Sequence, residues 1–427
     1  MKANRLRVDI GLAIFCVLLV AAIFTPTNAF AGAEDLKDAL QEYAKGDYDA
    51  ALTKLRGYVE SNPDDSEVYA VLLETENRVL IRALAQGGEH ERLIKYLLAK
   101  SKPMESDGLG DDEIKALVDE AVNSKDITVQ RSARVKLRAA GERAVPHLYP
   151  YLASEDADTA VNAILALRQL HSDATVPLAE CLHSDSARVR AYAATVLGDI
   201  GDARALPCVA RVAALDDDPG AQEKAGKALA KLGGRSGSVA DTYVVLGNSY
   251  YARDLNVVEG FDAVKSMWRW EEGGLVRYEA PSYLYPFLQA EECASDALAL
   301  DPGHLGARAL LARALLAQSV EAEVLNANGG SAPESLGGAF NLAKSQGFGA
   351  ATAALEASMQ AEDWDVAVEC CYLAAATYGG EDLAGHALGH ALAAPQKRVR
   401  YAAAISALRL SPKRGMPNAD KVVSLGA

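Results

Sequence analysis

The clearest pattern in this sequence lies in residues 185–202, which read DSARVRAYAATVLGDIGD. Within this stretch Ala193 and Leu197 stand four residues apart, so both lie on one face of an α-helix. The same Ala-to-Leu spacing occurs four times, at intervals of 30 to 32 residues. The alanines are Ala133, Ala163, Ala193 and Ala225, and their partners are Leu137, Leu167, Leu197 and Leu229. A recurrence of this length predicts a helical repeat protein.

Prolines mark a second helix in each repeat. Pro146, Pro177 and Pro207 recur at spacings of 31 and 30 residues, each beside an apolar stretch. Proline is accepted in the first turn of a helix, where its missing N–H costs nothing. Each repeat is therefore predicted to contain two helices and a turn. The composition agrees, because half of the residues are hydrophobic and only 6% are aromatic, which suits helices that pack through small side chains.

The sequence of residues 185–202 resembles the HEAT-like repeats that are often named after phycobilisome lyases. The resemblance covers about residues 112–233 and returns at residues 398–404, RVRYAAA, where Ala404 and Leu408 again stand four apart. It implies a right-handed α-solenoid and is specific for fold, whereas it says little about activity. In such repeats the valine packs inward, and we expect the arginines to be struts between repeats rather than ligand contacts. These arginines are Arg188, Arg190, Arg398 and Arg400.

A second type of repeat is indicated near the N-terminus and again in the middle of the chain. Residues 46–65, from Gly46-Asp47-Tyr48 to Asn62-Pro63-Asp64-Asp65, look like the second half of a tetratricopeptide repeat. Residues 243–250 match the first helix of another copy, and residues 290–302 match its second helix. The alternation of the two repeat types resembles large exported bacterial HEAT-repeat proteins.

The two halves of the second copy are separated by an insertion of about 31 residues, at about 254–285. Apolar and polar residues alternate in two segments of this insertion, residues 267–271 and 275–279. These segments flank Gly273-Gly274, and the pattern predicts a β-hairpin. The aromatic side chains gathered here form either a patch that faces a partner or a face buried on the solenoid, and we favour burial because a lone hairpin is only marginally stable. The candidate binding residues are Trp268, Trp270, Tyr278, Tyr283 and Tyr285.

The first residues predict a secretory signal. Lys2, Arg5 and Arg7 precede an apolar run over residues 10–24, and Ala29-Phe30-Ala31 offers small residues for cleavage before Gly32. We therefore expect a periplasmic or secreted protein with no stable membrane insertion after cleavage, and an uncleaved anchor is the alternative.

The charge of the chain argues against nucleic acid as a partner. The formal net charge is −15, and loss of residues 1–31 would make it about −17. Such a surface repels phosphate backbones unless a local basic patch exists. Five cysteines would remain without CxxC spacing, which favours buried thiols over a zinc site or a disulfide framework. A disulfide between Cys181 and Cys208, in successive repeats, is the less favoured alternative.

The sequence contains no residue set that supports catalysis. His386 and His390 stand four apart and are weak metal candidates, since the glutamate of an H-E-x-x-H motif is absent. No phosphate-binding loop or nucleophile elbow occurs, and no cofactor is expected. We interpret Asp216-Asp217-Asp218 as solvated turn residues that cap a helix.

Together these patterns predict an all-α solenoid of HEAT-like and TPR-like helix pairs with a small inserted β-hairpin. The predicted function is a non-enzymatic exported scaffold that binds a protein or peptide; the alternatives are an enzyme or enzyme subunit of the lyase type, and a self-associating envelope spacer. The predicted regions are a signal peptide over 1–31, TPR-like helices over 32–107, HEAT-like repeats over 112–233, a TPR-like unit with the hairpin over 239–318, and HEAT-like repeats over 335–427.

Overall fold

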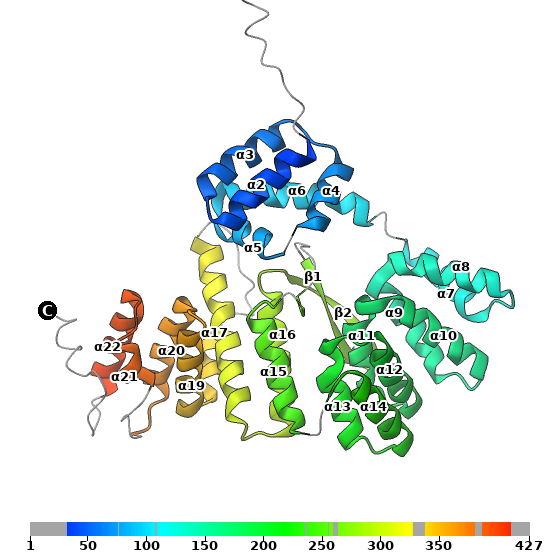
Figure 1. The fold of residues 1–427 in the computed structure, drawn as a ribbon. Helices are drawn as coiled ribbons and strands as arrows, with labels where there is room; N and C mark the ends of the chain where they lie inside the picture. Colours follow the sequence, from blue (N-terminus) through cyan, green and yellow to red (C-terminus); the bar gives the residue numbers. More distant parts are fainter. Residues whose placement is uncertain are drawn as a thin grey trace, which may run out of the picture. The chain divides into compact units, whose positions relative to one another are not determined.

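The computed structural model divides the chain into two compact units, Met1–Asp107 and Gly108–Ala427 (Figure 1). The predicted signal peptide lies outside the described residues. The structure describes residues 32–410 except 76, 107–108, 235–236, 255, 259–263, 328–337 and 381–386.

Unit 1 is a small helical domain. Its first helix ends at Gly46, whose φ of +86° is left-handed, and the Asp47 side chain then caps the next helix by accepting a hydrogen bond from the N–H of Ala50. The Tyr43 hydroxyl and His90 Nδ1 are 2.8 Å apart and join the first helix to the last. The helices are α2 (Ala33–Lys45), α3 (Tyr48–Glu60), α4 (Asp65–Glu74), α5 (Asn77–Ala85) and α6 (Gly88–Ser106).

Unit 2 begins with an array of short helix pairs, which we call the first array. Its longer helices begin at polar N-caps, such as Asp156, Ser186 and Asp218, each of which accepts a hydrogen bond from a backbone N–H. The elements of the first array are α7 (Asp111–Asn123), α8 (Ile127–Leu137), η1 (Arg138–Ala144), α9 (Val145–Leu148), η2 (Tyr149–Ala153), α10 (Ala157–Gln169), η3 (His171–Ala174), α11 (Thr175–Glu180), η4 (Cys181–His183), α12 (Ala187–Ile200), η5 (Ala203–Ala205), α13 (Leu206–Leu215) and α14 (Pro219–Lys231).

The repeating Ala and Leu residues build the core of the first array. All four alanines are fully buried, as are the leucines of the first three repeats, while Leu229 at the end of the series is half-buried. Pro146 and Pro207 lie in the first turn of α9 and α13. The sequence period thus marks the residues that each helix presents to its neighbours.

The predicted arginine struts are present between repeats. Arg188 donates hydrogen bonds to the carbonyl oxygens of Ala153 and Ser154 in the preceding repeat. Arg190 forms a bidentate pair of 2.7 Å with Asp216 in the following repeat. The expectation that Asp216 is solvated is therefore wrong, because its carboxylate is buried against this guanidinium.

The two C-terminal arginines of the series also form contacts with earlier residues. Arg398 pairs with Asp365, 33 residues earlier, and Arg400 donates to the carbonyl oxygens of Ala394 and Pro395. Arg188 and Arg190 thus link successive repeats, and Arg398 and Arg400 tie the last described helix to the elements before it.

The rest of unit 2 forms the second array. Gly247 lets two helices cross closely, because a Cβ placed there would meet Leu310 Cδ2 at 2.6 Å and Cys293 Cβ at 2.9 Å. The helices are α15 (Val239–Tyr251), α16 (Tyr285–Leu300), α17 (Leu305–Ala327), α18 (Ala339–Ser345), α19 (Phe348–Gln360), α20 (Trp364–Thr377), α21 (Ala387–Ala391) and α22 (Lys397–Leu410). Unit 2 is therefore a helical repeat solenoid with an inserted hairpin.

The inserted hairpin consists of β1 (Val264–Glu271) and β2 (Gly274–Pro281), paired antiparallel with Trp268 opposite Arg277. Its two-residue turn has positive φ at both Glu272 and Gly273, the combination that matches the twist of a tight hairpin. The predicted insertion at about 254–285 contains both strands.

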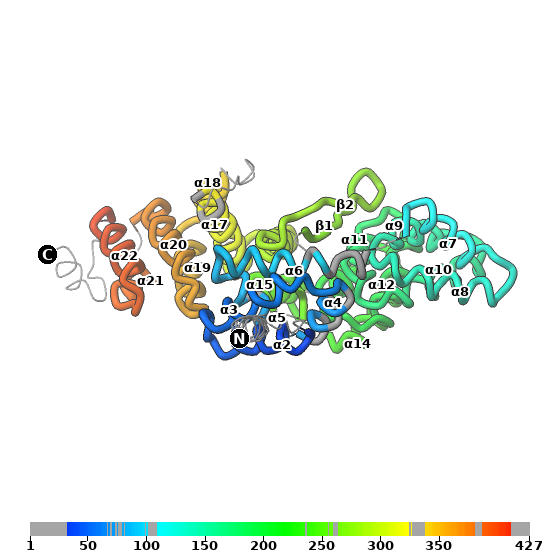
Figure 2. The backbone as a smooth tube through the Cα atoms, turned by 90° about the horizontal axis from the view of Figure 1, so that it is seen from above, coloured from blue at the N-terminus to red at the C-terminus, as the bar shows by residue number. Residues whose placement is uncertain are grey.

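The hairpin packs on both arrays. On one face Met267 and Ala280 join the hydrophobic core of the second array, and on the other face Trp270 and Leu275 pack against the core of the first array. Figure 2 shows the strands running beside α11, which β1 contacts. The hairpin is therefore a wedge between the two arrays.

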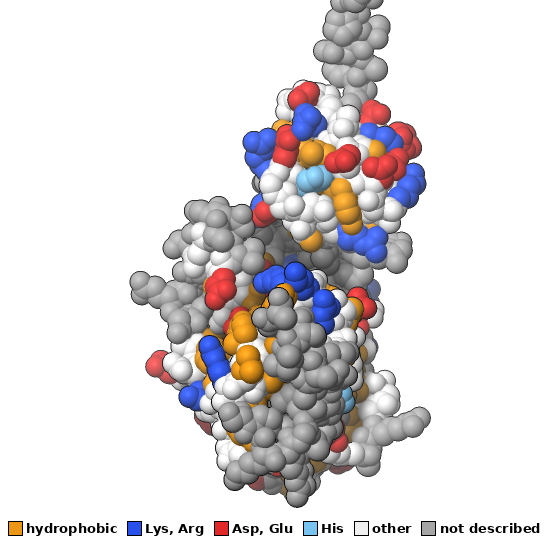
Figure 3. Space-filling model, turned by 90° about the vertical axis from the view of Figure 1, so that its left-hand side faces the viewer, with side chains coloured by type: hydrophobic (Ala, Val, Ile, Leu, Met, Phe, Trp, Pro, Cys, Tyr) orange, Lys and Arg blue, Asp and Glu red, His pale blue; other side chains and the backbone are white. Residues whose placement is uncertain are grey.

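The last described helix of unit 2 carries exposed apolar side chains. Tyr401, Ile405 and Leu408 of α22 follow one another at intervals of four and three residues and lie on one face. Figure 3 looks onto this end of unit 2, where apolar and basic side chains gather. Among the described residues, no helix is long and apolar enough to cross a membrane.

Candidate functional site

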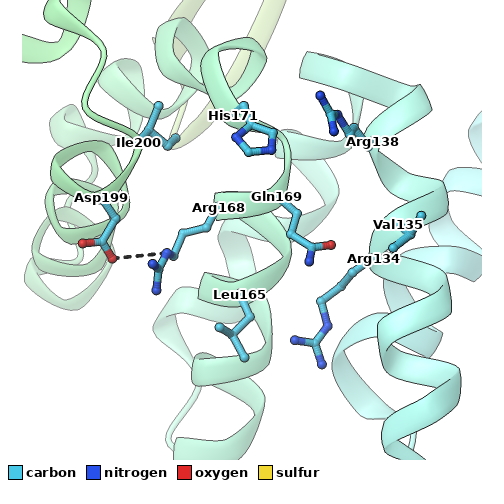
Figure 4. Close-up of a pocket in the computed structure, with 9 residues that line it drawn as sticks. All are labelled: Arg134, Val135, Arg138, Leu165, Arg168, Gln169, His171, Asp199 and Ile200. Carbon is cyan, nitrogen blue, oxygen red and sulfur yellow. Dashed lines mark ion pairs between the residues drawn. The ribbon is translucent and has the colours of Figure 1, made fainter.

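A groove of about 530 Å³ opens between three helices of the first array. Helix α10 forms its floor, and α8 and α12 flank it on either side (Figure 4). Its lining residues are Arg134, Val135, Arg138, Leu165, Arg168, Gln169, His171, Asp199 and Ile200. We call this surface the arginine groove.

One repeat position changes from arginine to glycine along the first array. That position directly follows the buried leucine, and it is Arg138 in the first repeat, Arg168 in the second and Gly198 in the third. At Gly198 the next helix comes so close that an added Cβ would lie 2.6 Å from Ala228 Cα. A side chain as long as arginine cannot fit such a contact, and α10 packs less closely against α8 and α12 than α12 packs against α14.

The groove concentrates positive charge on an acidic protein. Three arginines line it against one carboxylate, Asp199, whose oxygens are already paired with Arg168 at 3.3 Å and with Lys231 at 2.5 Å. Within the part of the chain that the structure describes, no carboxylate lies at ion-pair distance from Arg134 or Arg138. The groove therefore has an excess of guanidinium groups.

Arg134 is the most constrained of these arginines. Its residue is only 7% exposed, and its guanidinium donates to the backbone oxygen and the Oε1 of Gln130, both uncharged. Burial, together with the positive charge of Arg131, lowers the pKa of Arg134. A half-satisfied buried cation of this kind gains free energy when an anion approaches it.

Apolar side chains lie beside the arginines. Val135 is 66% exposed and Leu165 is 37% exposed, and both line the groove. Exposed apolar residues on neighbouring helices become a contact surface when they are continuous with polar anchors. The arginine groove can therefore hold a chain segment that offers both apolar and acidic side chains.

The groove does not have the parts of a catalytic centre. Its polar groups are arginines, a glutamine, a histidine and a carboxylate that is held in ion pairs, and it contains no Ser or Cys nucleophile. Within the described ranges, no group of three or more His, Cys, Asp or Glu side chains is placed to hold a metal ion. The lining offers positive charge, hydrogen-bond donors and apolar surface.

The structure disperses the five aromatic candidates of the hairpin region. Trp268 is 3% exposed and Tyr285 is also buried, so neither side chain is accessible to a partner while the hairpin is packed. Trp270 and Tyr283 are half-buried. Tyr278 is 41% exposed and donates a hydrogen bond of 2.7 Å to Glu271. A role in contacting a partner therefore stays a prediction for these five residues, of which Trp268 and Tyr285 are buried in this structure.

The two tryptophans fasten the hairpin to the first array. Trp268 Nε1 donates to Glu142 Oε2 at 2.9 Å, and the backbone N–H of Trp270 donates to Glu180 Oε2 at 3.1 Å. The Trp270 ring meets Tyr149 edge to face at 5.4 Å between centroids. Burial of the tryptophan face is what makes the hairpin part of the solenoid.

Carboxyl groups with raised pKa values lie beneath the hairpin. Burial raises the pKa of Glu180 to about 8, and the negative charge of Glu292 adds to this effect. Burial also raises the pKa of Asp296 to about 6 and raises that of Glu292, although Arg269 pairs with Glu292 at 2.6 Å and opposes the shift. Glu180 therefore keeps its proton at neutral pH.

The other sequence candidates have simple outcomes. His386 lies outside the described residues, and His390 is exposed on α21, so the metal pair stays a prediction. The cysteines of the described residues are free thiols, which excludes a disulfide between Cys181 and Cys208 in this structure. Burial raises the pKa of Cys208 to about 12, which keeps that thiol protonated.

Comparison with known families agrees with this geometry. Residues 175–242, from α11 into α15, match the family described as HEAT repeats. This part of the chain is similar to HEAT repeats. No curated protein matches the chain at a significant level. The match covers Gly198 and its close contact with α14, and the arginine groove reaches from this HEAT region back to α8.

Sequence reasoning did not find the arginine groove. A signal was present, because aligning the repeats on their leucines shows Arg138 and Arg168 where the third repeat has Gly198. We expected the repeat arginines to be struts, which holds for Arg188 and Arg190. The groove arginines lie on α8, at its C-terminal end and on α10, at other positions of the repeat than the strut arginines of α12.

Proposed function

We propose that this protein is an exported scaffold that binds a segment of another protein in the arginine groove. HEAT-repeat solenoids present extended surfaces of this kind to protein partners. The observation that carries the proposal is the exposure of Val135 and Leu165 beside Arg134 and Arg138, which have no carboxylate partner among the described residues.

Affinity capture from the extracellular and envelope fractions tests this function. The protein is compared with a Val135→Ser, Leu165→Ser double variant, which removes the apolar side chains of the groove. A matched control, Ile127→Ser with Leu215→Ser, removes two equally exposed apolar side chains that do not line the groove. We expect one partner to be retained by the parent and the control and lost by the groove variant. Equal retention by all three proteins contradicts the proposal.

Export is the second part of the proposal and rests on the pattern of residues 1–31. Cell fractionation followed by N-terminal sequencing checks it. We expect the protein outside the cytoplasm with Gly32 as its first residue. A cytoplasmic protein that begins at Met1 contradicts export and leaves the binding function to be tested by itself.

A further inference from the structure

We infer that the occupant of the arginine groove is an extended protein segment in which acidic and apolar side chains alternate. This inference rests on the function proposed above and specifies the chemistry of the partner. Arg134, Arg138 and Arg168 supply the charge that recognises the acids, and Val135 and Leu165 supply the apolar contacts.

The dimensions of the groove favour a short extended strand of chain. Packed helices lie about 8–10 Å apart, so a path across three of them covers about 20 Å. An extended chain advances about 3.3 Å per residue, so roughly six residues span this path. On two helices of the groove an apolar side chain lies within one turn of an arginine, Val135 beside Arg134 and Leu165 three residues before Arg168, so a segment that crosses the groove meets apolar and basic groups in turn.

The charges of the groove favour carboxylates. Arg138 and Arg134 have no carboxylate partner among the residues that the structure describes, and guanidinium groups bind carboxylates in a bidentate manner. The rest of the protein carries a large negative charge, so an acidic partner is directed away from other surfaces and into this one. The groove is thus the place where an acidic segment gains favourable contacts.

A nucleic acid fits these observations less well. Proteins that hold single strands commonly stack the bases on Phe, Tyr or Trp side chains, and the lining of the groove contains none of these three. The net charge of −15 also repels a long polyanion, whereas a short acidic peptide feels mainly the local field of the groove. The lining residues therefore favour a peptide.

Peptide binding measured by fluorescence anisotropy tests the inference. The probes are dye-labelled eight-residue peptides in which Leu alternates with Glu, with Gln or with Lys. The Glu peptide is expected to bind the full-length protein about tenfold more tightly than the Gln peptide, since two or three partly exposed ion pairs together give an effect of this size. The Lys peptide is expected to bind more weakly still, and added salt should reduce the difference.

Charge-reversal variants identify the surface that is used. Arg138→Glu with Arg168→Glu is expected to weaken binding of the Glu peptide by about thirtyfold or more, because attraction becomes repulsion. The control, Lys125→Glu with Lys136→Glu, makes the same change in net charge at exposed positions near the groove that do not line it. It should change the affinity by less than about threefold. Circular dichroism establishes that both variants are folded.

Three results would overturn the inference. Equal binding of the Glu peptide to the groove variant and its control shows that the arginines do not hold it. Equal affinity for the Gln and Glu peptides, lost in the Val135→Ser, Leu165→Ser variant, refutes an acidic partner while the scaffold function stands. Displacement of the Glu peptide by an equal concentration of a short oligothymidylate identifies a general polyanion site instead.

Discussion

Two neighbouring parts of the first array pack differently although they share one repeat. Helices α12 and α14 touch at Gly198, where a Cβ would lie 2.6 Å from Ala228 Cα. Helices α8, α10 and α12 stand apart, and the equivalent residues there are Arg138 and Arg168. The position thus carries glycine where the helices pack closely and arginine where the groove lies.

The largest expected effect comes from forcing a side chain into the closed contact. Gly198→Val should destabilise the protein by about 3 kcal/mol, because the new Cβ must displace the backbone of α14. Chemical denaturation monitored by circular dichroism measures this change. The control is Gly226→Ala on α14, where an added Cβ meets nothing within 4 Å. That control should be neutral or stabilising, by up to about 1 kcal/mol. Similar losses in both variants would mean that the close approach at Gly198 is not what matters.

A slightly smaller loss of stability is expected when the ion pair between Arg190 and Asp216 is removed. Arg190→Ala should cost about 2–3 kcal/mol, since it leaves the buried Asp216 carboxylate without its bidentate partner. The same denaturation measurement checks it, and Arg190→Ala with Asp216→Asn should recover part of the loss. If the double variant is as unstable as the single one, the cost does not come from the stranded carboxylate.

Two buried carboxyl groups, Asp216 and Glu180, are expected to contribute to stability with opposite pH dependence. The hydrogen bonds from Arg190 lower the pKa of Asp216, so its contribution is present above the unfolded pKa of about 4 and is lost as the pH falls. Burial raises the pKa of Glu180 to about 8, so its contribution is full below the unfolded value and is lost as the pH rises toward 8.

Stability should therefore decline between about pH 5 and pH 8 by at most about 1.4 kcal/mol per pH unit for the Glu180 proton. Glu180→Gln removes this titration and keeps an oxygen that can accept from the Trp270 N–H. Unfolding curves at pH 5, 6.5 and 8 should show a flatter pH dependence for this variant than for the parent. If stability falls with pH equally in the variant and the parent, other groups cause the pH dependence. Asp296, whose pKa is also raised, is the first candidate.

The smallest effect on stability is expected in the open region. Arg168→Ala should change the free energy of unfolding by no more than about 0.5 kcal/mol, because the Arg168 side chain is half-exposed and Lys231 still neutralises the Asp199 carboxylate. Binding of the acidic peptide should nevertheless weaken, which anisotropy measures. If Arg168→Ala loses much stability but binds the peptide as the parent does, Arg168 stabilises the fold and does not serve binding.

Much of the fold can be predicted from the sequence because the core residues of a repeat protein recur at fixed intervals. Ala193 and Leu197 are buried as their spacing requires, and the two strands of the hairpin lie within the predicted insertion. The partners of the hairpin were not predictable, since the contact of Trp268 with Glu142 joins residues 126 positions apart. No local pattern encodes which helix a tryptophan will meet at that distance.

The groove was missed for a related physical reason. A repeat pattern draws attention to the residues that its copies share, whereas the groove arises from a position at which they differ. Arg168 reads as an ordinary surface residue until the packing of Gly198 shows how little space the equivalent position leaves. Comparing the copies position by position recovers this signal.

The hairpin also changes the mechanics of the solenoid. In a simple repeat stack each unit touches only its neighbours, so small bends add up along the length as in a spring. Residues 264–281 depart from this rule, because they follow α15 in the chain and yet reach back to α11 and to Glu142. The hairpin thereby cross-links the middle of unit 2, and we expect this part to bend less than the helices on either side of it.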